Sequence, residues 1–253
     1  MKVSIITVVL NNADCIADAI ESVLSQKLEG AELEYIIVDG GSTDNTPEII
    51  KSYGSRITRT ITGKDKGIYH AMNKGLQAAT GDIIGILNSV DFYTGPHVLA
   101  KVLEVFKSTN ADTVYGDLKY VHPQDTDRTL RYWRSGIYRP GSFKLGWMPP
   151  HPTFFVKKHL YEKHGYFDTE FTSAADYELM LRMLHKHNAS AGYVPEVLVK
   201  MRAGGKSNKQ ISNRLHANRE DRRAWQKNGL RLPFYTGWLK PLRKLPQFLR
   251  RGK

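Results

Sequence analysis

Residues 3–10 read Val-Ser-Ile-Ile-Thr-Val-Val-Leu, and this stretch decides the fold class. The run is apolar and rich in β-branched side chains, which is typical of a strand buried on both faces of a parallel sheet. Residues 14–26 follow, with apolar side chains at a helical spacing. The chain therefore begins with a buried strand and an amphipathic helix.

The same alternation continues to residue 115. Further strands are expected at 34–38, 57–61, 82–87 and 113–115, and helices at 46–53, 67–80 and 96–109. Asn45 is a candidate N-cap for the helix at 46–53, and Pro47 suits its first turn. Strands and helices that alternate with short connections predict an α/β fold with a doubly wound, mostly parallel sheet and helices on both faces.

The second half of the chain is less regular. Residues 116–150 are dominated by Tyr, Trp, Arg, Gly and Pro, which predicts an irregular acceptor-binding segment or a mobile loop. A strand is expected at 151–156, helices at 158–165 and 174–187, a strand at 193–199 and a helix at 212–228.

The charge is concentrated at the carboxyl end. The chain has 37 Lys and Arg against 25 Asp and Glu, a net charge of +12. Residues 206–253 hold 14 of these bases and two acids, so they carry the whole net charge, and the body before them is neutral. After residue 228, aromatic and aliphatic residues interleave with Lys and Arg. This pattern favours an amphipathic tail on an anionic membrane surface. The alternative is a tail packed on the body with a solvated basic face.

Composition excludes several classes of protein. A hydrophobic content of 41% indicates a folded chain, and the single cysteine, Cys15, excludes an internal disulfide framework or a structural zinc cluster and fits a reducing compartment. No apolar run reaches 18 residues, and Met1 leads directly into the first strand, so neither a membrane span nor a signal peptide is expected. The basic tail would also suit a nucleic-acid-binding protein, but the neutral body and the lack of a nucleic-acid motif argue against one. No G-x-G-x-x-G follows the first strand, which argues against a dinucleotide-dependent oxidoreductase.

Polar clusters follow the strands at 11–12, 39–44, 64–67 and 88–91. Ligands of such sheets bind beyond the carboxyl ends of the strands, so these clusters predict the site. Asp39 suits recognition of a nucleobase, or it is a turn-forming Asp among glycines. Asp91 can hold a hard divalent cation that neutralises a diphosphate, or it caps the following helix.

Three residues of the second half are candidates for acid–base chemistry: His151, Asp176 and Glu178. Asp176 and Glu178 are two positions apart on a helix, so only one of them is expected to face a site, where it could deprotonate a sugar hydroxyl. The alternative is a solvated first helical turn, where acids are favoured. Residues 202–207 form a basic loop able to close on phosphate, or an ordinary surface loop.

In their order along the chain, these motifs resemble those of the family 2 glycosyltransferases, which have the GT-A fold. The resemblance covers about residues 2–207 and is nearest to the bacterial branch that builds O-antigen, colanic-acid and capsule repeat units. It is carried by SIIT (4–7), VDGGSTD (38–44), DKGIYHAMNKG (65–75), LNSVD (87–91), HPTFF (151–155), ADYEL (175–179) and GGKS (204–207).

The resemblance implies an inverting transfer, in one displacement, of a hexose or N-acetylhexosamine from a UDP-sugar to a polyprenyl-diphosphate-linked sugar acceptor in surface polysaccharide synthesis, such as O-antigen of lipopolysaccharide. It implies Mn²⁺ or Mg²⁺ as cofactor. It also implies a cytoplasmic enzyme at the inner face of the plasma membrane. Residues 1–115 would bind the nucleotide sugar, 116–207 would hold the acceptor and the catalytic base, and 208–253 would be the tail.

The resemblance also implies roles for single residues. Asp176 would be the general base and Asp91 the metal ligand of the Asp-x-Asp motif. The nucleotide sugar would be bound by Thr7, Asn11, Asp39, Asp65, Gly67, Asn73, Asn88 and Asp91, with Thr7 and Asp39 at the uridine. The acceptor or diphosphate would be contacted by His151, Glu178, Arg202, Gly204, Gly205 and Ser207.

Two positions depart from the family pattern. Val90 stands where the residue before the metal-ligand Asp is often acidic, and its side chain cannot contact ribose or metal. A catalytically impaired relative that still binds nucleotide sugars is therefore the alternative function. His70 stands where Asp is often found in this branch, which we interpret as tuning for donor or acceptor.

Overall fold

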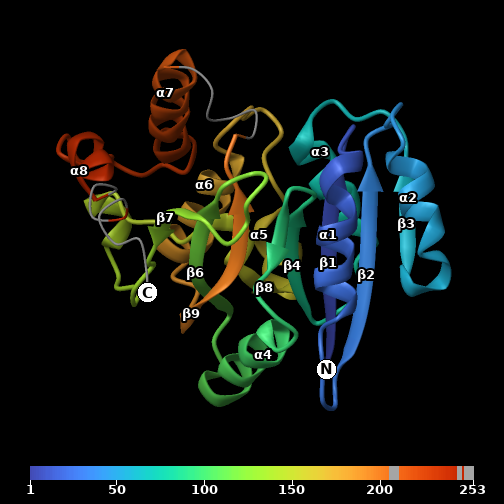
Figure 1. Cartoon of the computed structure of the whole chain (residues 1–253). Helices are drawn as coiled ribbons and strands as arrows, with labels where there is room; N and C mark the ends of the chain where they lie inside the picture. Colours follow the sequence, from blue (N-terminus) through green and yellow to red (C-terminus); the bar gives the residue numbers. More distant parts are fainter. Residues whose placement is uncertain (205–210, 244–246, 248–253) are drawn as a thin grey trace.

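The computed structural model describes residues 1–204, 211–243 and 247, and within them nine strands form one sheet with helices on both faces (Figure 1). The strand order is β3-β2-β1-β4-β8-β6-β9-β5, with β7 paired to β6. The strands are β1 (Lys2–Val9), β2 (Glu32–Asp39), β3 (Arg59–Thr62), β4 (Ile83–Asn88), β5 (Asp91–Tyr93), β6 (Thr113–Val121), β7 (Thr129–Trp133), β8 (Phe155–Lys157) and β9 (Ala191–Arg202).

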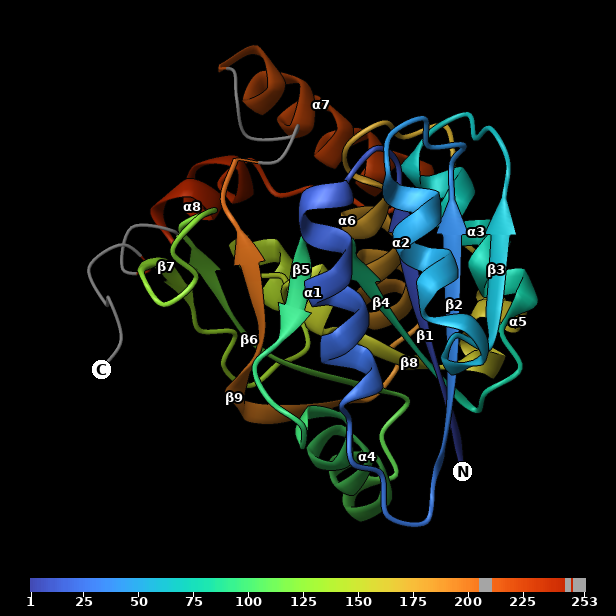
Figure 2. The same ribbon diagram turned by 45° about the vertical axis from the view of Figure 1, so that its right-hand side comes forward.

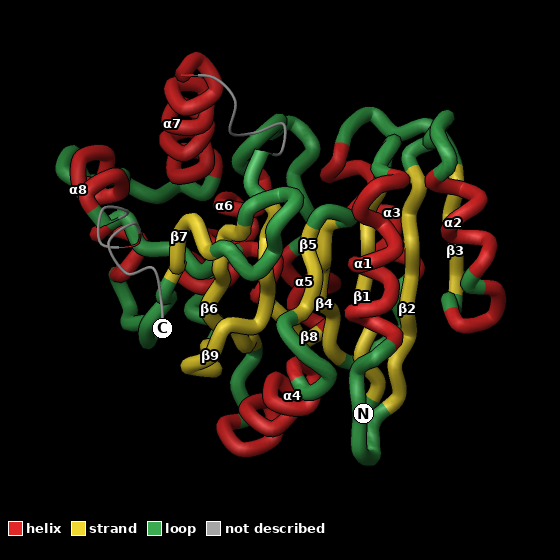
Figure 3. The backbone as a smooth tube through the Cα atoms, viewed as in Figure 1, coloured by secondary structure: helices red, strands yellow, loops and turns green. Residues whose placement is uncertain are grey.

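Helices connect most of these strands (Figure 3). They are α1 (Ala13–Leu24), α2 (Thr46–Ser52), α3 (Ile68–Ala78), α4 (Val98–Thr109), α5 (Lys158–His164), α6 (Ala175–Met180), α7 (Ile211–Lys227) and α8 (Thr236–Leu242). Short 3₁₀ turns lie at Gly54–Arg56, Ser142–Leu145 and His151–Thr153, and a π-helical turn, Leu181–Lys186, continues α6.

Parallel pairing brings the strand ends together. β1 pairs in parallel with β2 and β4, and β2 with β3, while in the second half β6 and β9 are parallel and the other pairs antiparallel. The carboxyl ends of β1, β2, β3 and β4 therefore share one edge, where ligands of such sheets bind. The predicted fold class, an α/β fold with a largely parallel sheet flanked by helices, is confirmed.

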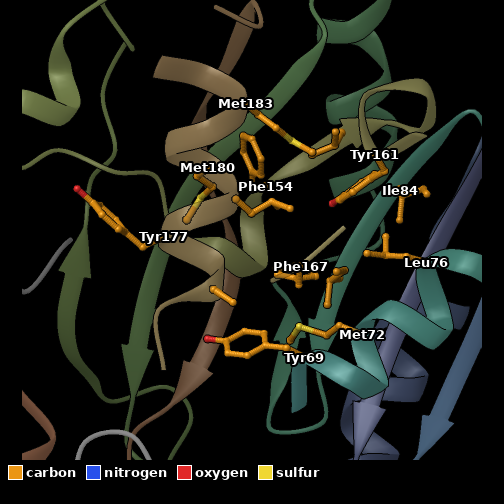
Figure 4. Packing of buried hydrophobic residues seen from close by; sticks show 14 of the residues in the cluster. Tyr69, Met72, Leu76, Ile84, Phe154, Tyr161, Phe167, Tyr177, Met180 and Met183 are labelled. Atoms are coloured by element: carbon orange, nitrogen blue, oxygen red, sulfur yellow. The ribbon is translucent and has the colours of Figure 1, made fainter. Parts of the chain in front are cut away.

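Two apolar cores cover the two faces of the sheet. Successive side chains of β1 alternate between them, because strand side chains have a period of two: Ile6 and Val8 join the core under α3, whereas Ile5 and Val9 join the core under α1 and α4. Figure 2 shows α1 and α2 in front of the sheet. The other core lies between α3 and α6, where Tyr69 from α3 approaches the first turn of α6 (Figure 4).

Several elements differ from the sequence prediction. The segment 116–150 contains the end of β6 and all of β7, and β5 begins at Asp91, the last residue of the 88–91 cluster. β5 has three residues and β7 has five, which are too few to show a period. His151–Thr153 is a 3₁₀ turn and not the start of a strand. Proline at 150 and 152 explains this, because a proline has no N–H for a strand ladder.

The carboxyl-terminal region is partly integrated into the body. α7 runs from Ile211 to Lys227, and its Ala224 and Trp225 are fully buried in the core that also contains α6. No helix in the described part of the chain is long and apolar enough to cross a membrane. The functional division at residues 115 and 116 stays a prediction, and it falls inside β6.

Candidate functional site

The loops after β1 and β2 are bonded to each other. The backbone N–H of Asn11 donates to Ser42 Oγ (2.8 Å), and Asn11 Oδ1 accepts from the Thr43 N–H (2.8 Å). Asp44 then joins both following helices, because its carboxylate accepts from Ala13 N–H at the start of α1 and from Thr46 N–H at the start of α2. Asp44 thus supplies the capping contact that was expected of Asn45, whose side chain makes none. These bonds place Asn11 at the edge of the sheet where ligands of such sheets bind.

Asp39 lies at the end of β2 and forms a turn. Its buried Oδ1 accepts from the N–H (2.9 Å) and the hydroxyl (2.7 Å) of Ser42, and the chain between them passes through Gly41 at φ +88°. The turn-forming interpretation of Asp39 is therefore confirmed. A nucleobase contact would use the other carboxylate oxygen, and it stays a prediction.

Asp65 and Gly67 lie at the same edge. Asp65 Oδ1 is 2.6 Å from Lys74 Nζ, and its Oδ2 faces Gly40, beside the Asp39 turn. Gly67 immediately precedes α3, and its carbonyl accepts the first N–H bonds of that helix. The structure thus brings Asn11, Asp39, Asp65 and Gly67 to one edge of the sheet, as the sequence predicts.

Thr7 and Asn73 are placed differently. Thr7 is fully buried, and its hydroxyl accepts a hydrogen bond from Tyr35 Oη (3.0 Å). The Asn73 amide exchanges two bonds with the backbone of Phe167, Nδ2 to the carbonyl (2.9 Å) and Oδ1 from the N–H (3.0 Å). Uridine or nucleotide contacts through these side chains do not fit this placement, because Thr7 points into the core and Asn73 holds α3 to the segment before α6.

Asp91 is the most constrained acid of the site. It begins β5, opposite Met201 of β9, and is fully buried, with Oδ2 accepting from Asn88 Nδ2 (3.0 Å). The alternative role as a helix cap is wrong, since α4 begins after His97. Burial raises the pKa of Asp91 to about 7, and the Asn88 bond and the charge of Arg202 only partly offset it.

Two oxygens of this turn bear on the expected cation. Asp91 Oδ1 and Asn88 Oδ1 are buried and have no hydrogen-bond partner. Buried polar atoms are rarely left unpaired, and oxygen atoms are the ligands that Mg²⁺ and Mn²⁺ prefer. In the described part of the chain, no group of three or more His, Cys, Asp and Glu is arranged to hold a metal ion. The pair therefore fits a divalent cation only if substrate and water complete the coordination.

Arg202 lies against the same turn. Its Nη1 donates to the Val90 carbonyl (3.2 Å), its guanidinium stacks 4.7 Å from the Phe92 ring centre, and Nη2 pairs with Asp18. β9 therefore brings a cation beside Asn88 and Asp91, as expected for a diphosphate contact. Gly204 follows β9 and is exposed, while Gly205 and Ser207 lie outside the described residues.

Asp176 is the accessible acid of α6. Its neighbours Ala175, Tyr177 and Glu178 are buried, whereas Asp176 remains half-buried. Tyr69 Oη from α3 donates to Asp176 Oδ1 (3.4 Å). Of the two acids of this helix, Asp176 is therefore the more accessible, and the expectation that only one of them faces a site stays a prediction.

His151 lies next to Asp176. Its ring meets Phe167 edge-on at 5.6 Å, and burial lowers its pKa, although the charge of Asp176 acts in the opposite direction. A neutral imidazole can accept a hydrogen bond from a sugar hydroxyl through one ring nitrogen or donate one to it through the other.

Glu178 does not belong to the site. Its carboxylate forms a two-pronged ion pair with Arg182 (2.8 and 3.0 Å) and accepts from Asn228 Nδ2 (2.9 Å). The predicted acceptor contact therefore does not fit, because both oxygens are bonded inside the protein. Arg182 in turn donates to the carbonyls of Gly165 and Tyr166, so the pair holds α6 to the end of α5.

Tyr120 is a further residue near the two candidate acids that the sequence did not indicate. It lies on β6, and Arg131 of β7 stacks 4.8 Å from its ring centre. Burial raises the pKa of the Tyr120 hydroxyl, Arg131 opposes this, and the charges of Asp91 and Asp176 raise it further. Tyr120 therefore lies within electrostatic reach of both acids. It falls in the segment 116–150, where no periodic signal marked a strand.

Glu220 of α7 was also not indicated. Its carboxylate accepts from the N–H and hydroxyl groups of both Thr172 and Ser173, at 2.7–3.1 Å. These two residues immediately precede α6, so a side chain from the tail fixes the loop that leads to Asp176. The hydrogen bonds lower the pKa of Glu220 despite its burial.

Comparison with known proteins finds a family model and relatives that match this chain. The family model described as "Glycosyl transferase family 2" matches residues 4–187. An uncharacterized glycosyltransferase of Mycobacterium tuberculosis is 30% identical over 186 residues, which cover 71% of this chain and 68% of that protein. Glycosyltransferase AglE of Haloferax volcanii is 26% identical over 180 residues, covering 69% and 58%.

Solved structures share the fold. Staphylococcus aureus TarS 1–349, in complex with UDP-GlcNAc, superposes with a TM-score of 0.70 at 17% identity, covering 99% of this chain and 72% of that one. The chain spans 43% of the longer TarS structure. The mannosyltransferase PcManGT of Pyrobaculum calidifontis, in complex with GDP-Man and Mn²⁺, superposes with a TM-score of 0.65 at 18% identity, covering 99% and 76%.

Proposed function

Because the chain belongs to glycosyl transferase family 2 and is thus a glycosyltransferase that uses a nucleotide sugar, we propose that its donor is a UDP-sugar and that its reaction is inverting. The sugar would be a hexose or N-acetylhexosamine, and the acceptor a polyprenyl-diphosphate-linked saccharide in surface polysaccharide synthesis. The observation that carries this proposal is the half-buried Asp176 carboxylate, which accepts a hydrogen bond from Tyr69 and whose charge acts on both His151 and Tyr120.

Asp176 is the general base of the proposed reaction. Its carboxylate takes the proton of the acceptor hydroxyl, whose oxygen forms a bond to the anomeric carbon while the bond to the diphosphate oxygen breaks. The electron pair leaves with the nucleoside diphosphate, and the single displacement inverts the configuration. The Tyr69 hydroxyl keeps Asp176 oriented, because it donates to one carboxylate oxygen and leaves the other for the acceptor.

The donor side must stabilise the leaving diphosphate. The Arg202 guanidinium is positively charged and lies at the Val90 carbonyl, beside the Asn88–Asp91 turn, so it would contact the phosphate oxygens. A divalent cation, Mn²⁺ or Mg²⁺, would be held by Asp91 and Asn88 and would neutralise the same charge. Val90 is half-buried and apolar at this turn, so it supplies no second carboxylate for the cation. Arg202 would therefore neutralise a larger share of the diphosphate charge than in a site with two carboxylates.

UDP is proposed over other nucleotides because the sequence motifs resemble those of family members that use UDP-sugars. S. aureus TarS was solved with UDP-GlcNAc, whereas PcManGT was solved with GDP-Man and Mn²⁺. Both likenesses concern the fold, so the base must be tested directly. A lipid-linked acceptor would place the enzyme at the cytoplasmic face of the plasma membrane, a location that the basic tail supports.

Calorimetric titration tests this proposal. The protein is titrated with UDP, a panel of UDP-sugars and GDP-mannose, with Mn²⁺ and with a chelator. We expect micromolar binding of UDP that weakens with chelator. Arg202→Met is expected to weaken it about tenfold, because a charge-assisted bond is lost. The matched control is Lys107→Met, at an exposed position of α4, and this variant should bind UDP as the wild type does.

The other outcomes have clear meanings. Binding of UDP that is indifferent to chelator would reject the cation and leave Arg202 as the phosphate contact. Binding of GDP-mannose alone would reject the UDP assignment. Nucleotide binding without any transfer to sugar acceptors would identify the catalytically impaired alternative.

A further inference from the structure

α8 has the reverse of the usual polarity of a surface helix. Its polar side chains face the protein: Thr236 is buried, and the Lys240 side chain is only 16% exposed. Its large exposed side chains are apolar: Trp238 is 77% exposed and Leu242 56%, and Phe234, two residues before the helix, is 90% exposed. Positions 236 and 240 are one turn apart, as are 238 and 242, so the inward polar pair and the outward apolar pair occupy two different faces of the helix.

Specific contacts hold α8 in this orientation. Lys240 pairs with Asp221 of α7 and lies 4.0 Å from the ring centre of Tyr177 in α6. The Thr236 hydroxyl donates to the Lys144 carbonyl. Gly146 allows the close approach, since a Cβ there would lie 2.6 Å from the Lys240 backbone and its φ is +73°. The outward face of α8 is therefore not produced by a loosely attached helix.

The charge around this face is of one sign. The last acid of the chain is Asp221, and residues 222–253 contain ten Lys and Arg. Arg231 and Arg243, on either side of the apolar set, are both exposed. Large exposed aromatic side chains flanked by Arg and Lys are the composition of helices that lie in the interface of an anionic bilayer.

α8 lies toward the end of the molecule that carries the candidate site. Figures 1 and 2 both place α7 and α8 toward the end where β1 and β2 terminate, opposite α4. We infer that Phe234, Tyr235, Trp238 and Leu242 form a membrane-contacting face that seats the enzyme on an anionic lipid surface, with Arg231 and Arg243 at the headgroups. Only the role of this face, which is to bring the site to a lipid-linked acceptor, rests on the proposed function.

Vesicle co-sedimentation tests the inference without any nucleotide. The full chain is mixed with vesicles of phosphatidylcholine and with vesicles that also contain phosphatidylglycerol. We expect binding to the anionic vesicles that weakens with salt. The double variant Phe234→Ser/Trp238→Ser should lose at least about tenfold in partition coefficient, and Arg243→Glu several-fold.

Matched controls remove equivalent groups elsewhere. Leu10→Ser removes another exposed apolar side chain, and Lys107→Glu reverses a charge on α4, so both should bind vesicles as the wild type does. Tryptophan emission is a second readout. Of the other three tryptophans, Trp147 and Trp225 are buried and Trp133 is half-buried on β7, so a blue shift with anionic vesicles that Trp238→Phe abolishes would place Trp238 in lipid.

Three results would overturn the inference: no binding of the wild type to anionic vesicles, equal binding of the double variant, or a dimer that the double variant converts to a monomer. The last would assign the face to a second copy of the chain. Titration of UDP into the double variant separates this question from the proposed function, because nucleotide binding should be unchanged whether or not the membrane face is correct.

Discussion

Asp176 and Glu178 are similar acids of one helix that differ in burial: Glu178 is buried and Asp176 is half-buried. Asp176 and Glu178 occur in the same helical turn, and either could be a base by its chemistry. Glu178 is neutralised by Arg182 and Asn228 inside the protein, whereas Asp176 keeps an accessible carboxylate oriented by Tyr69. A carboxylate whose two oxygens are already bonded inside the protein is a poor acceptor for a substrate proton, so Asp176 is the acid that we propose as the base.

Replacing Asp176 by Asn should abolish most of the transfer. The amide has nearly the same shape but cannot take the acceptor proton, so we expect kcat to fall at least about 100-fold. The affinity for UDP measured by calorimetry should not change. Glu104→Gln, an exposed amidation on α4, is the control. A variant that retains more than about a tenth of the activity would exclude Asp176 as the base.

At the scale of elements, one buried carboxylate, Glu34, connects the amino ends of neighbouring strands of the sheet. Glu34 of β2 accepts from the Ser4 hydroxyl of β1 and from the N–H (2.7 Å) and hydroxyl (2.6 Å) of Thr80 before β4, and Lys2 lies 3.5 Å away. These bonds hold the pKa of Glu34 at about 2, although burial alone would raise it. Three neighbouring strands are thereby tied at the end opposite the site.

The low pKa of Glu34 predicts a pH-dependent stability. A carboxyl group with a lower pKa in the folded state stabilises the protein above its unfolded pKa and loses that effect as the pH falls through the folded value. We expect Glu34→Gln to lower the free energy of unfolding by about 2–3 kcal/mol at pH 7, with the difference shrinking between about pH 4.5 and pH 2.

Urea denaturation of both proteins at pH 7, 5 and 3 measures this difference. Glu32→Gln is the control, since Glu32 is at the same edge but its side chain is 69% exposed. A difference between wild type and Glu34→Gln that is the same at all three pH values would contradict the prediction.

α7 holds the loop that leads to Asp176. Glu220 fixes Thr172 and Ser173, so Glu220→Ala should release the loop before α6 and misplace Asp176. We expect kcat to fall about tenfold with little change in the KM for the donor, because small displacements of a catalytic group are costly. Glu220→Gln, which keeps one acceptor oxygen, should recover part of the loss.

Arg219→Ala is the matched control for Glu220, since Arg219 is exposed on the same helix. Steady-state kinetics and thermal unfolding are measured in parallel. If the KM for the donor rises while kcat is unchanged, Glu220 acts on the donor side or on the fold and not on the placement of the base.

At the scale of the whole molecule, the site is shared by two halves joined through one sheet. β1, β2 and β4 bring Asn11, Asp39 and Asp91 to the edge from the first half, and β9 and α6 bring Arg202 and Asp176 from the second. The antiparallel pairing of β5 with β9 connects them, because Asp91 is opposite Met201 and Arg202 follows it. Neither half alone contains all the residues that we propose for binding the donor and for removing the acceptor proton.

The sequence by itself determined the alternating strands and helices of the first 115 residues, the edge of the sheet where ligands bind, and the basic tail. Apolar periodicity records which face of each element is buried, and it is local in the chain, so it can be read directly. The order of the motifs also indicated the family, which the matched family model confirms.

Only the tertiary structure decided which polar side chains remain available. Thr7, Asn73 and Glu178 have partners at Tyr35, Phe167 and Asn228, from 28 to 94 residues away. No local pattern reports such pairings. The orientation of α8 was decided in the same way, because contacts with distant α6 and α7 turn Lys240 inward and leave Trp238 outside. The local periodicity therefore determines where the ligand-binding edge of the sheet lies. Hydrogen bonds and ion pairs between segments far apart in the chain determine which polar side chains at that edge can contact a ligand.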